Sequence, residues 1–201
     1  MNGKIILILS LLFLVACGHT VPRNVANSCD MLDQKSGWYK AAKKTEKKYG
    51  TPIHVQLAII RQESSFKYNA KTEHNYLLWV IPWGRKSSAY GYAQVKDETW
   101  DWYKDKTGNK GADRDDFKDA VDFVGWYTDV SQKTLGISKW DAYNQYLAYH
   151  EGHGGFKRKS YLKKKWLMDV AKKVDRYSKT YAVQLKTCEG DLGGWSLWPF
   201  R

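Results

Sequence analysis

The sequence predicts a mainly α-helical protein made of one domain, with an inserted loop or small hairpin in its first half. The chain has 201 residues, a length that suits one domain with its own core. Apolar side chains recur at helical spacing in several segments. Residues 67–90 lack this spacing and contain Pro82 and Gly84. We therefore expect a helical domain interrupted by one irregular insertion.

Two helices are expected before the insertion. The first is capped by Ser36 and runs to about Tyr49, where Gly50 ends it. In the second, Thr51 suits the N-cap and Pro52 the first helical position. One apolar face of this second helix is formed by Ile53, Leu57 and Ile60. The short connection predicts two helices packed together.

Four helices are expected after the insertion. A short one starts at Asp97, and a long one starts near Asp113. The next runs from Ser138 to His150, and the last starts at Ser160. The side chains expected to face the core from these last two helices are Trp140, Tyr143, Tyr146, Leu147, Leu162, Trp166, Val170, Val174, Tyr177 and Tyr181. A tail follows, so we expect the domain to span residues 36–188 and the tail 189–201.

The composition favours a polyanionic partner. Lys and Arg number 33 against 21 acidic residues, a formal charge of +12. Such an excess suits nucleic acid, anionic lipid or acidic cell-wall polymer. The N-terminal sequence helps to decide among these partners, because it indicates the compartment. Lys4 precedes an apolar run, and Leu14 to Cys17 resembles the lipobox of bacterial lipoproteins. The alternative is an ordinary signal peptide with a coincidental cysteine.

The lipobox resemblance implies a signal peptide over 1–16 and a lipidated tether over 17–35, with the lipid on Cys17. The protein would be anchored to a membrane outside the cytosol, so nucleic acid is not an expected partner. Gly18 in place of Asp resembles lipoproteins sent to the outer membrane, facing the periplasm, if the organism is Gram-negative. Cys29 and Cys188 are then the remaining thiols, and export allows them to form a disulfide. Two free thiols are the alternative.

Glu63 is the candidate catalytic residue. It lies three residues after Ile60, at the edge of the apolar face and near the helix C-terminus. Burial and the negative end of the helix dipole both disfavour its ionised form. Such a carboxyl can stay protonated near neutral pH, as a general acid in glycoside cleavage requires. A solvated surface glutamate is the alternative from this segment alone.

Three segments together resemble the signature of lytic transglycosylases with a goose-type lysozyme-like domain, which is ES, then GLMQ, then AYN before a glycine turn. Glu63 and Ser64 match the first. Gly91 and Gln94 match the second, with Tyr92 and Ala93 in place of Leu and Met. Ala148 and Tyr149 match the third, with His150 where Asn is common. The resemblance covers about residues 38–177 and implies a lysozyme-like fold. Because Glu63 and Gly91 lie further apart than is usual in that family, it also implies that residues 67–90 are an insertion beside the cleft.

This resemblance implies cleavage of the MurNAc–GlcNAc β-1,4 bond in peptidoglycan, with 1,6-anhydro-MurNAc formed and no cofactor or metal. Glu63 would act as acid and then as base, assisted by the substrate's acetamido group. The residues that would contact substrate are Ser64, Gly91, Tyr92, Gln94, Tyr149 and His150. Tyr149 would orient either Glu63 or the substrate. We expect a monomer acting on glycan strands.

Alternatives remain at the sequence level. Trp79 and Trp83 of the insertion either stack on sugar rings or fold onto the domain. Glu151 could supply a second carboxylate, which would make the protein a hydrolytic muramidase. A peptidoglycan-binding lipoprotein without catalysis is a further alternative. Zinc is disfavoured, because His150 and His153 are three residues apart with glycines beside them and no HExxH motif is present.

Overall fold

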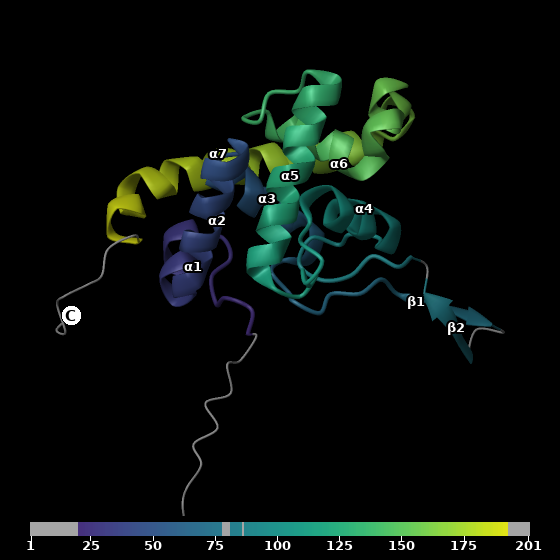
Figure 1. The fold of residues 1–201 in the computed structure, drawn as a ribbon, viewed down its shortest axis with the longest axis horizontal. Coiled ribbons are helices and arrows are strands. Elements are labelled where there is room, and N and C mark those ends of the chain that lie inside the picture. Colours follow the sequence, from purple (N-terminus) through teal and green to yellow (C-terminus); the bar gives the residue numbers. More distant parts are fainter. Residues whose placement is uncertain (1–19, 78–80, 86, 193–201) are drawn as a thin grey trace, which may run out of the picture.

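The protein is mainly helical, as predicted, in a computed structural model that describes residues 20–77, 81–85 and 87–192 (Figure 1). Between residues 74 and 85 only the backbone is described. The elements are α1 (Ser28–Gln34), α2 (Ser36–Tyr49), α3 (Ile53–Ser64), β1 (His74–Leu77), β2 (Ile81–Arg85), α4 (Asp97–Thr107), α5 (Phe117–Leu135), α6 (Ala142–Lys157), the 3₁₀ turn η1 (Ser160–Lys163) and α7 (Lys165–Leu192). No helix in the described ranges is long and apolar enough to cross a membrane.

Helix α3 lies in the middle of the helical body. It contacts α2, α5, α6 and α7, so its surroundings are apolar on several sides. Accordingly Val55, Ala58 and Ile59 are buried in addition to the predicted face. The predicted N-cap is wrong: the buried Thr51 hydroxyl lies 2.6 Å from that of Thr128, and Pro52 occupies the cap position. The core thus holds the helix that carries Glu63.

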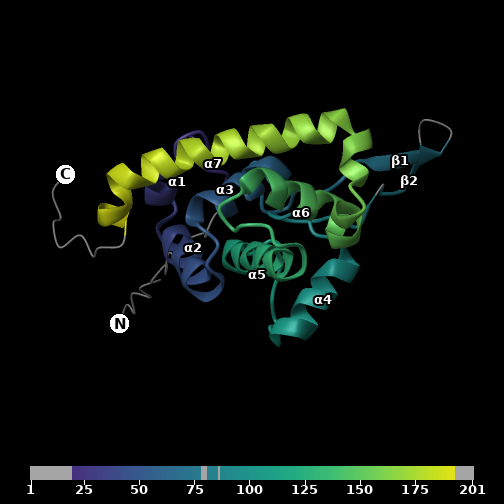
Figure 2. The ribbon, with the colours of Figure 1, turned by 90° about the horizontal axis from the view of Figure 1, so that it is seen from above.

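Helix α7 lies along α1, α3 and α6 (Figure 2). Its buried face repeats every three or four residues at Leu167, Ala171, Val174, Ser178, Tyr181 and Leu185. The prediction that Leu162 and Trp166 face the core is wrong, since both are exposed. Leu162 belongs to η1, and Trp166 precedes the first buried position. Trp140 is also exposed, because it lies in the turn before α6 begins at Ala142.

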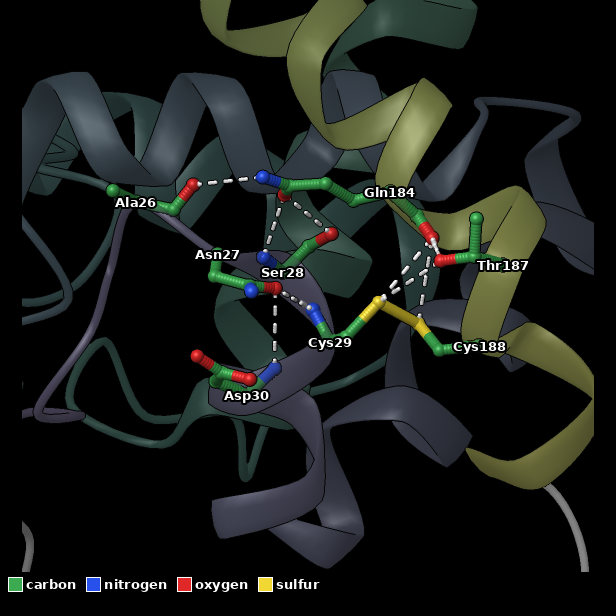
Figure 3. Close-up of a disulfide and its surroundings, with 8 residues drawn as sticks. All are labelled: Ala26, Asn27, Ser28, Cys29, Asp30, Gln184, Thr187 and Cys188. Carbon is green, nitrogen blue, oxygen red and sulfur yellow. Dashed lines mark hydrogen bonds between the residues drawn. A yellow bond between two sulfur atoms is a disulfide. The ribbon is translucent and has the colours of Figure 1, made fainter.

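The predicted tether over 17–35 is wrong in its second half. Residues Ser28–Gln34 form α1, capped by the Asn27 side chain, and its Met31 and Leu32 are fully buried. A disulfide joins Cys29 of α1 to Cys188 of α7, with their Cα atoms 6.0 Å apart (Figure 3). These are the two cysteines expected to pair. Helix α7 also continues to Leu192, past the predicted domain end.

The insertion contains a two-stranded antiparallel hairpin. Strands β1 and β2 pair with His74 opposite Arg85 and Leu77 opposite Ile81. Both views show the hairpin projecting away from the helices (Figures 1 and 2). At its base, Lys71 forms a bridge with Tyr90, which in turn pairs with Val95. These bridges fix the segment that carries Gly91 and Gln94.

Candidate active site

Glu63 opens onto a cavity of about 500 Å³. The walls come from α3, α4, α5 and α6, and from the two ends of the insertion. The lining residues are Glu63, Thr72, Ala89, Gln94, Val95, Lys96, Glu98, Thr99, Phe123, Tyr127, Tyr149, His150, Glu151 and Gly152. All three segments of the sequence signature therefore meet at one cavity, because α3, the 90–95 loop and α6 surround it.

The environment of Glu63 raises the pKa of its carboxyl group. Glu63 is the penultimate residue of α3 and is half-buried. Burial raises the pKa to about 7, while a hydrogen bond with the Tyr146 side chain opposes the rise. Since the hydroxyl is the donor, it favours the carboxylate form. A substantial fraction of Glu63 is thus protonated at neutral pH.

Tyr146, which sequence reasoning placed only in the core, is the tyrosine that hydrogen-bonds Glu63. It is buried on α6, one turn before Tyr149. The Tyr149 hydroxyl instead donates to the Ala93 carbonyl, at 2.6 Å. Tyr149 lines the cavity and holds the 90–95 loop against α6. Tyr146, and not Tyr149, is therefore the residue that can orient Glu63 through a hydrogen bond.

Gln94 lies at the cavity wall in a left-handed backbone conformation with φ of 49°. Its Nε2 donates to the carbonyls of Ala70 and Gly91, each at 2.9 Å. Both amide hydrogens are used inside the loop. In a hydrogen bond with a ligand, the Gln94 side-chain carbonyl oxygen would therefore accept from a donor on the ligand.

Gly91 is needed for packing of the loop rather than for approach of substrate. Its φ is 78°, and a Cβ built there would lie 2.0 Å from the Arg114 carbonyl oxygen. The neighbouring Tyr92 N–H donates to that same oxygen at 3.1 Å. A side chain at position 91 would push the loop off the segment before α5. The structure thus gives Gly91 a packing role, and the predicted substrate contact there stays a prediction.

Ser64 and Tyr92 were predicted to contact substrate, and their positions contradict this. Ser64 is buried, and its hydroxyl donates back to the Ile60 carbonyl at 3.3 Å. Tyr92 is buried with its ring edge-on to Trp38 and Phe117, at 5.7 and 5.5 Å. It lines a separate hollow beside α2 and the start of α5. The side chain turns inward because the loop puts Gln94, not Tyr92, on the cavity side.

His150 and Glu151 form part of a charged network at the cavity rim. Glu151 Oε1 accepts from Lys164 Nζ at 2.7 Å and lies 3.3 Å from His150 Nδ1, while Oε2 accepts from Ser160. The Glu151 side chain is only 4% exposed. Its burial acts to raise the pKa, but the hydrogen bonds from Lys164, Ser160 and His150 outweigh this and lower it to about 2. Glu151 is therefore a carboxylate at any physiological pH.

The two histidines of α6 lie in different environments. His153 Nε2 lies 2.9 Å from the Ser131 hydroxyl, and its ring stacks on Tyr127 at 4.5 Å. Gly152, with φ of 72° and ψ of 159°, breaks the helix between them. Within the described ranges, no group of three or more His, Cys, Asp or Glu side chains is arranged to hold a metal ion.

Some predicted positions lie outside the described residues. Cys17 and Trp79 are among them. Trp83 belongs to β2, where only the backbone is described. Their predicted roles in lipidation and sugar stacking stay predictions.

The cavity also contains residues that sequence reasoning did not assign to it. Phe123 and Tyr127 are four residues apart on α5, a spacing that also suits a core face. Lys96, Glu98 and Thr99 come from the start of α4. Glu98 is an exposed carboxyl group in a helix first turn, where acidic residues are common without any site. No local pattern distinguishes these residues from ordinary core or surface positions.

Comparison with known proteins identifies one family. A protein-family model described as "Transglycosylase SLT domain" matches residues 5–188, which is most of the chain. No curated protein matches the sequence.

Proposed function

Because the chain belongs to the transglycosylase SLT domain family, we propose that it is a peptidoglycan lytic transglycosylase. It cleaves the β-1,4 bond between MurNAc and GlcNAc and leaves a 1,6-anhydro-MurNAc end. The family match supports transglycosylase action on peptidoglycan in general. The observation that carries the finer proposal is Glu63, whose pKa is raised to about 7 at the wall of the cavity. General acid catalysis is most efficient when the pKa lies near the working pH.

The reaction needs one carboxyl group in two protonation states. Protonated Glu63 gives its proton to the glycosidic oxygen, and the bond from that oxygen to C1 of MurNAc breaks. The Glu63 carboxylate then takes the proton of the C6 hydroxyl, whose oxygen bonds to C1. Water is neither consumed nor formed. The hydrogen bond with Tyr146 favours the carboxylate that exists between the two steps.

Glu151 is a poor candidate for the second carboxylate that hydrolysis would need. A hydrolytic muramidase usually needs a second carboxylate as nucleophile or to activate water. Both oxygens of Glu151 are already engaged by Lys164, Ser160 and His150, and the side chain is almost fully buried. A carboxylate held in this way is a weak base with little access to a sugar. The role of second carboxylate therefore does not suit Glu151.

From the sequence around Cys17 we also propose where the protein works. Attachment of lipid to Cys17 would anchor it to a membrane in the cell envelope, the outer membrane if the organism is Gram-negative, as a monomer acting on glycan strands. Residues 20–27, between Cys17 and α1, would then be the link to the membrane. Metabolic labelling with a fatty acid tests the anchor, and unlabelled mature protein would contradict it.

The decisive experiment digests purified sacculi and determines the masses of the released muropeptides. We expect anhydro products, which are lighter than hydrolysed ones by one water. Glu63→Gln keeps the volume of the side chain, but its amide is not acidic enough to protonate the glycosidic oxygen, so the rate should fall by about 10² to 10⁴. Glu98→Gln makes the same change at an exposed carboxyl of the same cavity and should leave the anhydro product unchanged.

Other outcomes of the digestion would change the function assigned to the protein. Reducing-end muramic acid would indicate hydrolysis, with Glu98 as the second carboxylate to test. Folded protein that binds sacculi and releases nothing would indicate a binding lipoprotein. A Glu63→Gln variant as fast as wild type would remove Glu63 from the mechanism.

A further inference from the structure

Trp166 is an exposed aromatic residue beside the cavity. It lies in the first turn of α7, and the residue is 56% exposed. Its ring is edge-on to that of His150, with 5.2 Å between the ring centroids. His150 itself lines the cavity that Glu63 opens onto. The indole thus lies next to the cavity lining, one side chain beyond it.

The rim network fixes the start of α7 relative to the cavity. Lys164, two residues before Trp166, pairs with Glu151 of α6 at 2.7 Å. Ser160 of η1 donates to the other carboxylate oxygen of Glu151. Leu167, next to Trp166, is fully buried in the core. These contacts hold the backbone on both sides of Trp166, so its exposed ring has a defined place.

We propose that the glycan cleft continues past His150 onto Trp166, and that the indole ring is the platform on which a more distant sugar of the strand stacks. This inference rests on the proposed function. A pyranose ring has an apolar face of C–H groups, and an indole offers a large flat apolar surface with one N–H donor. Stacking would remove apolar surface of both partners from water. Trp166 is therefore a substrate-positioning residue for long strands, without a part in proton transfer.

Trp140 provides a matched control. It is 69% exposed, also at the edge of a helix, and its ring lies 5.4 Å from His54. His54 lies in the first turn of α3, whereas Glu63 lies in the last. Their separation of nine positions corresponds to about 14 Å along a helix axis. Trp140 therefore has a similar exposure at the far end of α3 from the catalytic candidate.

The test measures binding, with Glu63→Gln as the parent so that the ligand is not consumed. The probes are soluble peptidoglycan glycan strands without stem peptides, fractionated into short and long. Trp166→Ala in this parent should lower affinity for long strands about threefold to tenfold, the size expected for one lost aromatic contact. Affinity for the shortest strands that bind should not change. Trp166→Tyr should keep most of the affinity, and Trp140→Ala should bind like the parent.

The results separate this inference from the function on which it rests. A parent that binds no glycan would overturn both. A parent that binds long strands, with Trp166→Ala binding them equally well, would overturn only the extension onto Trp166. An equal loss for short and long strands would also overturn it, because it would indicate a disturbed rim rather than a lost distant contact. Circular dichroism and the melting temperature show whether each variant is folded.

Discussion

At the residue scale, the cavity contains two glutamates whose surroundings move their pKa values in opposite directions. Burial raises the pKa of Glu63 to about 7, and one tyrosine hydroxyl partly offsets it. Glu151 is also buried, but its partners Lys164, Ser160 and His150 lower its pKa to about 2. The same functional group is therefore an acid in one place and a permanent anion in the other. At Glu63 the effect of burial outweighs one hydrogen bond, whereas at Glu151 three hydrogen-bonding partners outweigh the effect of burial.

The pH profile of the reaction should reflect Glu63. The first step needs the protonated acid, so kcat/KM should fall as pH rises through about 7. Tyr146 lowers the pKa of Glu63 by its hydrogen bond. Tyr146→Phe removes that bond and should raise the pKa of Glu63. The fall in kcat/KM should then begin at a higher pH than in wild type. Glycan cleavage rates over a pH series measure the pH at which kcat/KM falls.

Tyr149→Phe is the control for this shift. The Tyr149 hydroxyl donates to the Ala93 carbonyl, so its loss should affect the loop and the rate. It should not move the fall in kcat/KM to higher pH. If kcat/KM of Tyr146→Phe fell over the same pH range as that of wild type, the result would contradict the role of the Tyr146 hydroxyl in lowering the pKa of Glu63.

At the element scale, the loop over residues 90–95 acts through its backbone shape. Gly91 and Gln94 both adopt positive φ, and the Gln94 amide closes the loop by two hydrogen bonds. Packing against Arg114 thus explains why the signature has a glycine at this position. The loop places Gln94 at the cavity because Gly91 permits the close approach behind it.

Gly91→Ala should therefore be costly. The added Cβ would meet the Arg114 carbonyl oxygen at 2.0 Å in a backbone conformation with φ of 78°. We expect a loss of about 2–4 kcal/mol in the free energy of unfolding, since strain and a backbone shift both contribute. Urea denaturation measures it.

Gly108→Ala is the matched control, because Gly108 has φ of 72° and nothing within 4 Å of the built Cβ. It should lose only about 1 kcal/mol, the cost of the left-handed conformation alone. Equal losses in the two variants would show that the Arg114 contact does not matter.

At the scale of the whole molecule, α1 and α7 hold the two ends of the described chain together. Met31 and Leu32 place α1 in the core, and the Gln184 side chain of α7 accepts from the Ser28 N–H at 2.8 Å and from its hydroxyl at 3.1 Å (Figure 3). The Cys29–Cys188 bond closes a loop with a sequence separation of 159. A crosslink over so long a loop mainly restricts the unfolded chain.

Replacing both cysteines by serine should lower stability without removing the chemistry. The chain-entropy model sets an upper limit of about 5 kcal/mol on the loss. Neither cysteine lines the cavity, so muropeptide release at low temperature should persist. Thermal unfolding with and without reductant measures the effect. Reductant should lower the melting temperature of wild type but not of the variant, and an unchanged wild type would contradict a stabilising role.

The sequence alone was enough to predict the helices from α2 onward, the carboxyl at the end of α3 and the pair of cysteines. Helical spacing is a local property, so the apolar pattern predicts a helix wherever it recurs. The motif order pointed to Glu63, Gln94 and Tyr149, and these three line one cavity. The helices depend on neighbours within a few residues along the chain, whereas the motif order and the cysteine pair were inferred from residue types along the whole sequence.

Only the tertiary structure decided where side chains at the edges of these elements point. Tyr146 rather than Tyr149 hydrogen-bonds Glu63, because α6 turns that residue toward the end of α3. Trp166 faces solvent because Leu167 and Ala171 set the face that α7 buries. A periodic pattern shows that one face of a helix is apolar, but at a helix end or in a loop the direction of a side chain depends on what packs opposite. That partner lies far away in the sequence, so it is known only once the chain is folded.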